Sequence, residues 1–270
     1  MIGEPLHSPY DLSFMLFGFR VRVTWLFWVI TAALGYNGSL GMHDSLERAG
    51  LDSPGLAAFL LLWVGVVFVS ILWHELGHAF AMRYYDIDSY VVLYHMGGLA
   101  IPAVYSRYTP GRQRRAGYGP LPQLVISAAG PAAQFALAAV VLAAAYAMGY
   151  WVYGMHWIAA MFGRGAVEGL DPIANPALEF FLWQFMFVNI WWALVNLLPV
   201  LPLDGGRIAQ HLFALTAKRD CTYEATTLGI VVAFLVAMWA YTNGESYIAI
   251  MFVVLGVTNL QNLRGGVHGY

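Results

Sequence analysis

Two histidines and a glutamate stand together in an otherwise apolar segment. Residues 74–78 read His-Glu-Leu-Gly-His, and no other charged residue occurs in the surrounding stretch 56–82. On a helix, His74 and His78 share one face because they are four positions apart, and Glu75 borders that face. Two imidazoles can hold a zinc ion while the carboxylate handles protons. The alternative is a structural cluster in which Glu75 bridges the histidines. A glutamate in hydrocarbon carries an energetic cost, which favours the functional interpretation.

A second polar motif lies further along the chain. Residues 196–206 read Asn-Leu-Leu-Pro-Val-Leu-Pro-Leu-Asp-Gly-Gly. Prolines and glycines break the helix here, just where Asp204 must turn inward. Broken backbone at membrane depth is tolerated only where it is buried in protein or lines a water-filled cavity. An ordinary helix end would explain the glycines but would leave Asn196 and Asp204 unexplained. The motif therefore predicts Asp204 as a third metal ligand.

The composition predicts the environment in which these residues work. Of 270 residues, 60% are hydrophobic and 10% are charged, whereas soluble domains carry about 25% charged residues. This composition indicates a polytopic membrane protein that interacts with the lipid bilayer. The net charge of -2 implies no nucleic-acid partner. The single cysteine, Cys221, excludes an intramolecular disulfide.

The predicted fold class is an all-α membrane protein with about six transmembrane helices. A span needs about 20 mostly apolar residues. Six stretches are candidates: Trp25 to Tyr36 extended on its N-terminal side, Leu56 to Met82, Leu121 to Tyr150, Leu178 to Val200, Ala225 to Tyr241 and Tyr247 to Leu263. The sequence shows no internal repeat and no soluble region long enough for another folded module. We therefore expect one polytopic domain over residues 1–270.

The basic residues predict the orientation in the membrane. Cytoplasmic loops of membrane proteins carry an excess of Lys and Arg. Alternating the six spans places eleven of the thirteen basic residues on one side: Arg20, Arg22, Arg83, Arg107, Arg112, Arg114, Arg115, Arg207, Lys218, Arg219 and Arg264. That side is predicted to be the cytoplasm, with both termini there, and the location to be the cytoplasmic membrane. At 1.5 Å per residue, His78 and His74 lie roughly 7 and 14 Å before Arg83. Asp204 falls near the same depth, at the inner end of the fourth span.

These motifs together closely resemble the site-2 protease family of intramembrane zinc metalloproteases. The resemblance rests on residues 74–78 together with Asn196-Leu-Leu-Pro and Leu203-Asp-Gly-Gly. Weaker matches are Ser127 to Pro131 on the third span, the pair Gly97 and Gly98, and the strand-like segment Phe19 to Trp25. Gln134 stands where the family often has asparagine. The chain is similar to compact members that lack PDZ and CBS domains.

The resemblance implies an enzyme that cuts peptide bonds within or near transmembrane segments of protein substrates. It implies one zinc ion per chain, held by His74, His78 and Asp204, with Glu75 as the catalytic base. Asn196 is the candidate for binding the substrate backbone or the developing oxyanion. Cleavage requires the substrate helix to unwind, and the freed backbone must pair again. Tyr90 to Ile101 with Phe19 to Thr24 is therefore predicted to form a small sheet in the cytoplasmic leaflet. Gly97 and Gly98 would allow a substrate strand to approach.

Other functions remain open from the sequence. A metal transporter would use the histidines and the aspartate as a transit site but would have no need of Glu75 as a base. A catalytically inactive relative would only bind membrane segments. A prenyl-protein type of membrane protease would take a downstream glutamate as its third ligand. The sequence does not identify the substrate, the trigger of cleavage or the oligomeric state.

Overall fold

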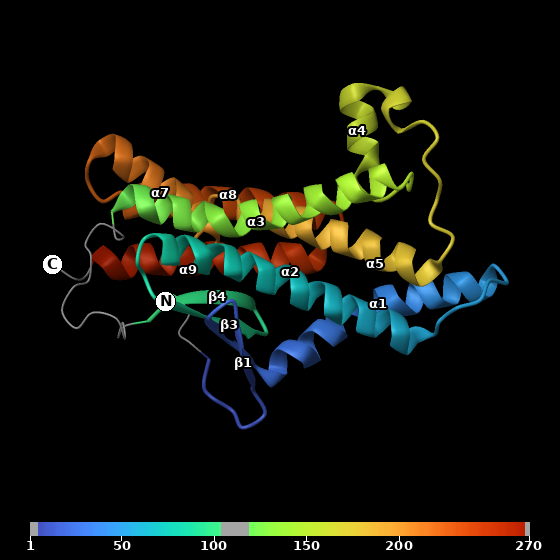
Figure 1. The fold of residues 1–270 in the computed structure, drawn as a ribbon. Coiled ribbons are helices and arrows are strands. Elements are labelled where there is room, and N and C mark those ends of the chain that lie inside the picture. The colour runs from blue at the N-terminus through green and yellow to red at the C-terminus, as the bar shows by residue number, and fades with distance from the viewer. Residues whose placement is uncertain (1–4, 104–118, 268–270) are drawn as a thin grey trace. The chain divides into compact units, whose positions relative to one another are not determined.

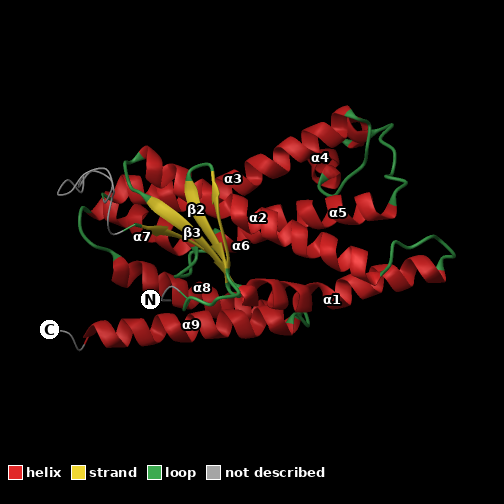
Figure 2. Ribbon diagram, turned by 60° about the horizontal axis from the view of Figure 1, so that its bottom comes forward, coloured by secondary structure: helices red, strands yellow, loops and turns green. Residues whose placement is uncertain are grey.

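The chain is mostly helical and carries one small sheet (Figures 1 and 2). The computed structural model describes residues 5–103 and 119–267. The described helices are α1 (Trp25–Arg48), α2 (Leu56–Tyr84), α3 (Pro120–Ala147), α4 (Met155–Phe162), α5 (Pro176–Phe187), α6 (Ala193–Asn196), α7 (Asp204–Ala217), α8 (Thr222–Thr242) and α9 (Ser246–Val267). A 3-10 turn, η2, spans Arg164–Val167, and a π-helical turn, η3, joins α5 to α6 over Val188–Trp192. Arg107, Arg112, Arg114 and Arg115 lie outside the described residues.

The predicted fold class is confirmed. Five helical stretches in the described part of the chain are long and apolar enough to cross a membrane: Leu56–Tyr84, Pro120–Ala147, Pro176–Asn196, Thr222–Thr242 and Ser246–Arg264. The first of the six predicted spans forms α1, which does not meet this criterion. Polar and charged residues such as Asn37, Asp44 and Glu47 occupy its C-terminal half.

The predicted extension of the first span was on the wrong side. The residues before Trp25 form a strand rather than further helix, and α1 instead continues past Tyr36 as far as Arg48. The alternation of Arg20 and Arg22 with valines has the two-residue period of a strand, which a helix cannot accommodate with one apolar face.

Four strands form a single sheet in the order β1-β2-β3-β4. They are β1 (Leu12–Leu16), β2 (Phe19–Val23), β3 (Ser89–Tyr94) and β4 (Gly97–Pro102). β2 pairs with β3 in parallel, with Val21 opposite Val91, and both outer pairs are antiparallel hairpins. The predicted pairing of these segments into one small sheet is therefore confirmed, and its place in the cytoplasmic leaflet stays a prediction. The sheet also contains strand β1, which the sequence did not predict. The chain reverses from β1 into β2 through Phe17 and Gly18, which have φ 50° and 80°.

The chain divides into two compact units. The first comprises Met1–Ala79, Ser89–Ala103 and Ala132–Ala193, and the second comprises Phe80–Asp88, Val104–Pro131 and Leu194–Tyr270. In the first unit, buried sheet residues such as Val21 and Leu93 pack with Leu72 and Leu76 of α2. This packing brings the sheet against the helix that carries the histidine motif. In the second unit, Val200 packs with Ala233 and Phe252 of α8 and α9.

Candidate metal centre

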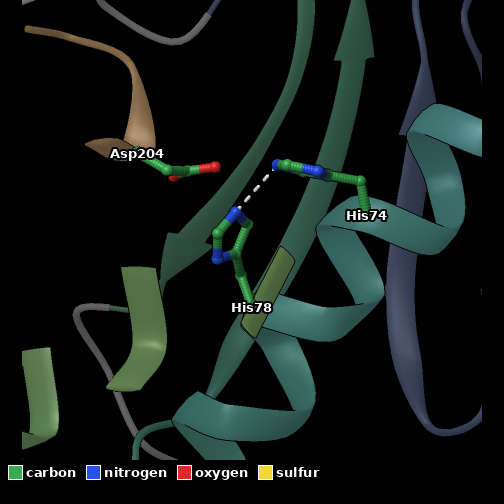
Figure 3. A group of neighbouring side chains, drawn as sticks. All are labelled: His74, His78 and Asp204. Atoms are coloured by element: carbon green, nitrogen blue, oxygen red, sulfur yellow. Dashed lines mark hydrogen bonds between the residues drawn. The ribbon is translucent and has the colours of Figure 1, made fainter. Parts of the chain in front are cut away.

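Both histidines of the predicted motif are buried on one face of α2. His74 is 4% exposed and His78 is 7% exposed. Their Nε2 atoms lie 3.0 Å apart, so the two rings point at a common position (Figure 3). A tetrahedral zinc ion at ordinary zinc–nitrogen distances requires two ligand nitrogens about 3.3 Å apart. The observed separation fits such an ion with a small adjustment.

Asp204 joins the two histidines in a group that could bind a metal ion. One ligand atom from each of His74, His78 and Asp204 lies within 4.8 Å of the others, and Figure 3 shows the carboxylate turned toward the two rings. Two imidazole nitrogens and one carboxylate oxygen are one of the donor sets found in catalytic zinc sites, which leave the fourth position open. The residues therefore fit zinc by number and by type.

The backbone around Asp204 leaves no space for side chains at the next two positions. Asp204 is the first residue of α7 and follows the segment Leu197–Leu203. A Cβ at Gly205 would clash with the carbonyl groups of Leu197 and Leu198, and one at Gly206 would lie 2.5 Å from the Leu201 nitrogen. The glycine pair thus allows the broken segment to fold back tightly on the start of the helix.

Glu75 contacts the sheet rather than solvent. Its side chain is 6% exposed. A Cβ at Gly98, the second residue of β4, would lie 2.5 Å from Glu75 Oε1. Gly98 therefore makes room for the glutamate. That Gly97 and Gly98 also allow a substrate strand to approach stays a prediction. Gly97 has φ 127°, a backbone conformation that favours glycine. A Cβ added at Gly97 would lie 3.8 Å from the Trp192 ring.

Tyr94 is a further polar residue near Glu75. It is the last residue of β3 and is 6% exposed. Burial raises the pKa of the Tyr94 phenol, and the charge of Glu75 raises that pKa further. Both causes keep the phenol protonated, so Tyr94 is a neutral hydroxyl beside the carboxylate.

Gln134 of α3 bonds directly to one of the candidate ligands. Its Oε1 lies 2.8 Å from His74 Nδ1, and Gln134 is fully buried. Its Nε2 donates to the Ser70 carbonyl at 3.4 Å. Sequence reasoning noted Gln134 only as a departure from a family pattern. A lone amide in an apolar helix was the available signal, because such a group requires a buried partner.

The other predicted residue, Asn196, ends α6 and is half-buried. Its amide bonds to no other residue in the described part of the chain, so it is available to another molecule. His95 lies exposed in the turn between β3 and β4, where its ring contacts Tyr94. It is not part of the metal-ligand group.

Comparison with known proteins gives one family. The model of peptidase family M50 matches residues 62–239, a range that contains Glu75 and all three candidate ligands. No curated protein matches the chain. Among solved structures, the chain is similar to a site-2 protease from Methanocaldococcus jannaschii, with 19% sequence identity and a TM-score of 0.49. That match covers 94% of this chain and 95% of the other.

Proposed function

This chain belongs to peptidase family M50, the site-2 protease family, and on that premise we propose that it is a zinc-dependent intramembrane protease. It hydrolyses peptide bonds within or near transmembrane segments of membrane proteins. The observation that carries the proposal is the group formed by the buried His74 and His78 with the half-buried Asp204, beside the buried Glu75. Both histidines and the glutamate lie on α2, a helix that is long and apolar enough to cross a membrane.

The zinc ion would be held by the two imidazoles and by the carboxylate of Asp204. When bound, zinc lowers the pKa of a coordinated water to about 7 and polarises the carbonyl that is attacked. The single anionic ligand leaves the ion with a net positive charge, which suits the developing oxyanion. We expect one zinc ion per chain.

Glu75 is the proposed general base and acid. It is adjacent to His74 in the sequence, and its side chain lies against Gly98 on the sheet side. From that position its carboxylate takes a proton from the attacking water and gives it to the leaving amide nitrogen. The neighbouring Tyr94 hydroxyl stays protonated and cannot compete with Glu75 as a base.

The substrate is proposed to add to the sheet at β4. This strand ends the order β1-β2-β3-β4, so its outer edge has no neighbour within that sheet. Its backbone groups can pair with an unwound substrate segment by strand addition. Because Gly98 of the same strand contacts Glu75, a bound substrate strand would run beside the proposed base. Asn196 is the proposed donor to the substrate backbone or to the oxyanion.

The proposed location is the cytoplasmic membrane, with both termini and the sheet on the cytoplasmic side. The support is the distribution of charge. Alternating the six predicted spans places the described basic residues Arg20, Arg22, Arg83 and Lys218 on the same side of the membrane. An excess of basic residues marks the cytoplasmic side. The substrate is then a protein with a transmembrane segment, and its cut lies in the inner half of the membrane.

Two measurements on purified protein in detergent test the proposal. Metal analysis should find about one zinc per chain in the wild type and a clear loss in Asp204→Ala. Glu75→Gln should keep zinc and fold but should not cleave a model transmembrane substrate, because the amide cannot take up a proton. A wild type without zinc, or wild-type turnover by Glu75→Gln, would overturn the proposal. A metal transporter would retain metal transport in Glu75→Gln, and an inactive relative would show no cleavage even in the wild type.

A further inference from the structure

We propose that Gln134 is the positioning residue for His74, and that it holds the ring in the tautomer and orientation that zinc requires. The inference rests on the proposed zinc function. It concerns a residue of α3, an element to which the sequence assigns no part of the metal site. The observation that carries it is the 2.8 Å contact between Gln134 Oε1 and His74 Nδ1.

The chemistry of the contact fixes the tautomer of His74. An amide oxygen only accepts hydrogen bonds, so Nδ1 must carry the proton and donate it. A neutral imidazole protonated at Nδ1 has its lone pair at Nε2. That atom faces His78 Nε2 at 3.0 Å. The lone pair therefore points to the position where the metal ion belongs.

The orientation of the Gln134 amide is itself fixed from the other end. Its Nε2 donates to the Ser70 carbonyl at 3.4 Å, and a backbone carbonyl can only accept. If the amide were turned over, its oxygen would face the Ser70 carbonyl oxygen, and its NH2 group would face His74. The two hydrogen bonds that link Ser70, Gln134 and His74 therefore have one consistent assignment of donors and acceptors.

Neighbouring hydrogen bonds hold both helices in place around this contact. Trp73 Nε1 donates to the Ala133 carbonyl at 3.1 Å, so adjacent residues of α2 and α3 are joined twice. From the π-helical turn η3, Asn189 Nδ2 donates to Ser70 Oγ at 2.8 Å. Asn189 and Ser70 are fully buried. Each end of the Gln134 amide therefore meets a partner that cannot shift freely.

Packing alone does not account for an amide at this position. An amide is unfavourable in an apolar medium unless its oxygen and nitrogen find hydrogen-bond partners. A leucine or methionine would fill similar space at no such cost. Metal-ligating histidines usually donate their second ring N–H to an outer partner, and loss of that partner weakens metal binding about 10–100-fold. Gln134 is placed to be that partner.

The test measures zinc affinity of the purified full-length protein by competition with a chelator of known affinity. Gln134→Met keeps the volume but has no acceptor for Nδ1–H, and its affinity should fall about 10–100-fold. Gln134→Glu keeps an oxygen at the same reach and should restore most of the affinity. Trp73→Phe is the matched control, because it breaks the adjacent α2–α3 hydrogen bond without touching His74. It should bind zinc as the wild type does.

The outcomes separate this inference from the proposed function. Wild-type protein that binds no zinc would remove both. Wild-type protein that binds zinc, with Gln134→Met unchanged or with Gln134→Glu as weak as Gln134→Met, would overturn only the role of Gln134. An equal loss in Trp73→Phe would also overturn it, since helix packing would then explain the effect. If Gln134→Met does not stay folded, Gln134→Leu takes its place. Its apolar side chain likewise offers no acceptor to Nδ1–H, and it should lose affinity in the same way.

Discussion

At the scale of single residues, the fit between Gly98 and Glu75 is the contact most open to a direct test. A methyl group at Gly98 would lie 2.5 Å from Oε1 of Glu75, whose side chain is buried. We expect Gly98→Ala to lower the free energy of unfolding by about 1–3 kcal/mol, the usual cost of overpacking. It should also reduce cleavage by displacing the carboxylate. Unfolding in detergent and turnover of a model substrate measure the two effects.

Two variants show whether the cost arises from Glu75 itself. In a Glu75→Ala background the clash partner is gone, so Gly98→Ala should have almost no effect on unfolding; contacting residues show such non-additivity. Gly65→Ala is the matched control, since Gly65 lies on the same helix and its Cβ would meet no atom within 4 Å. An equal cost of Gly98→Ala in both backgrounds would contradict the assignment.

The sequence predicts those site residues whose spacing is set by a single helix or a single motif. His74, Glu75 and His78 follow from the helical period, and Asp204 follows from the broken, glycine-rich segment around it. Gln134 is sixty residues from His74, and Tyr94 lies in a different element from Glu75. Such contacts depend on how α3 and the sheet pack on α2, and no spacing in the sequence reports that packing.

At the scale of elements, the start of α7 depends on glycine in its first turn. A Cβ at Gly205 would meet the carbonyl groups of Leu197 and Leu198, which are backbone and cannot move aside as a side chain can. Gly205→Ala should therefore destabilise by at least the upper end of the usual overpacking cost, about 3 kcal/mol. The displaced Asp204 should also lower the zinc content. Unfolding and metal analysis are the measurements.

Gly229 of α8 gives a graded control for that prediction. Its Cβ would lie 3.2 Å from the Pro199 carbonyl oxygen, so it meets the same segment at a longer distance. Gly229→Ala should cost less than Gly205→Ala and should leave the zinc content unchanged. A Gly205→Ala protein with wild-type zinc and wild-type unfolding would show that the segment can rearrange without disturbing Asp204.

Element boundaries were predictable where one local rule acts alone. The apolar length of α2 and the alternation in β2 and β3 are such cases. Strand β1 was missed because Phe14, Met15 and Leu16 are apolar in succession, so its residues do not alternate between apolar and polar. Gly18 was the available signal, because two-residue hairpin turns favour glycine. The end of α1 was missed because polar residues continue the helix beyond the apolar stretch.

At the scale of the whole molecule, the charge distribution makes the orientation in the membrane testable. Arg83 lies in the last turn of α2, and Lys218 follows α7, whereas the connection from α1 to α2 carries Asp52 and the turn from α8 to α9 carries Glu245. The excess of basic residues on cytoplasmic loops places the first pair inside and the second pair outside. The zinc site and the sheet would then receive water and substrate from the cytoplasmic side.

Cysteine labelling in oriented membranes tests this orientation. In a Cys221→Ser background, Tyr84→Cys and Lys218→Cys should react with a membrane-impermeant thiol reagent only from the cytoplasmic face. Leu51→Cys and Gly244→Cys should react only from the opposite face. All four positions are exposed, so burial within the protein does not limit labelling at any of them. The native Cys221 is buried and is replaced in this background. The mass of the cleaved substrate should place the cut in the inner half of its span. The reverse labelling pattern, or a cut in the outer half, would contradict both the orientation and access to the site from the cytoplasm.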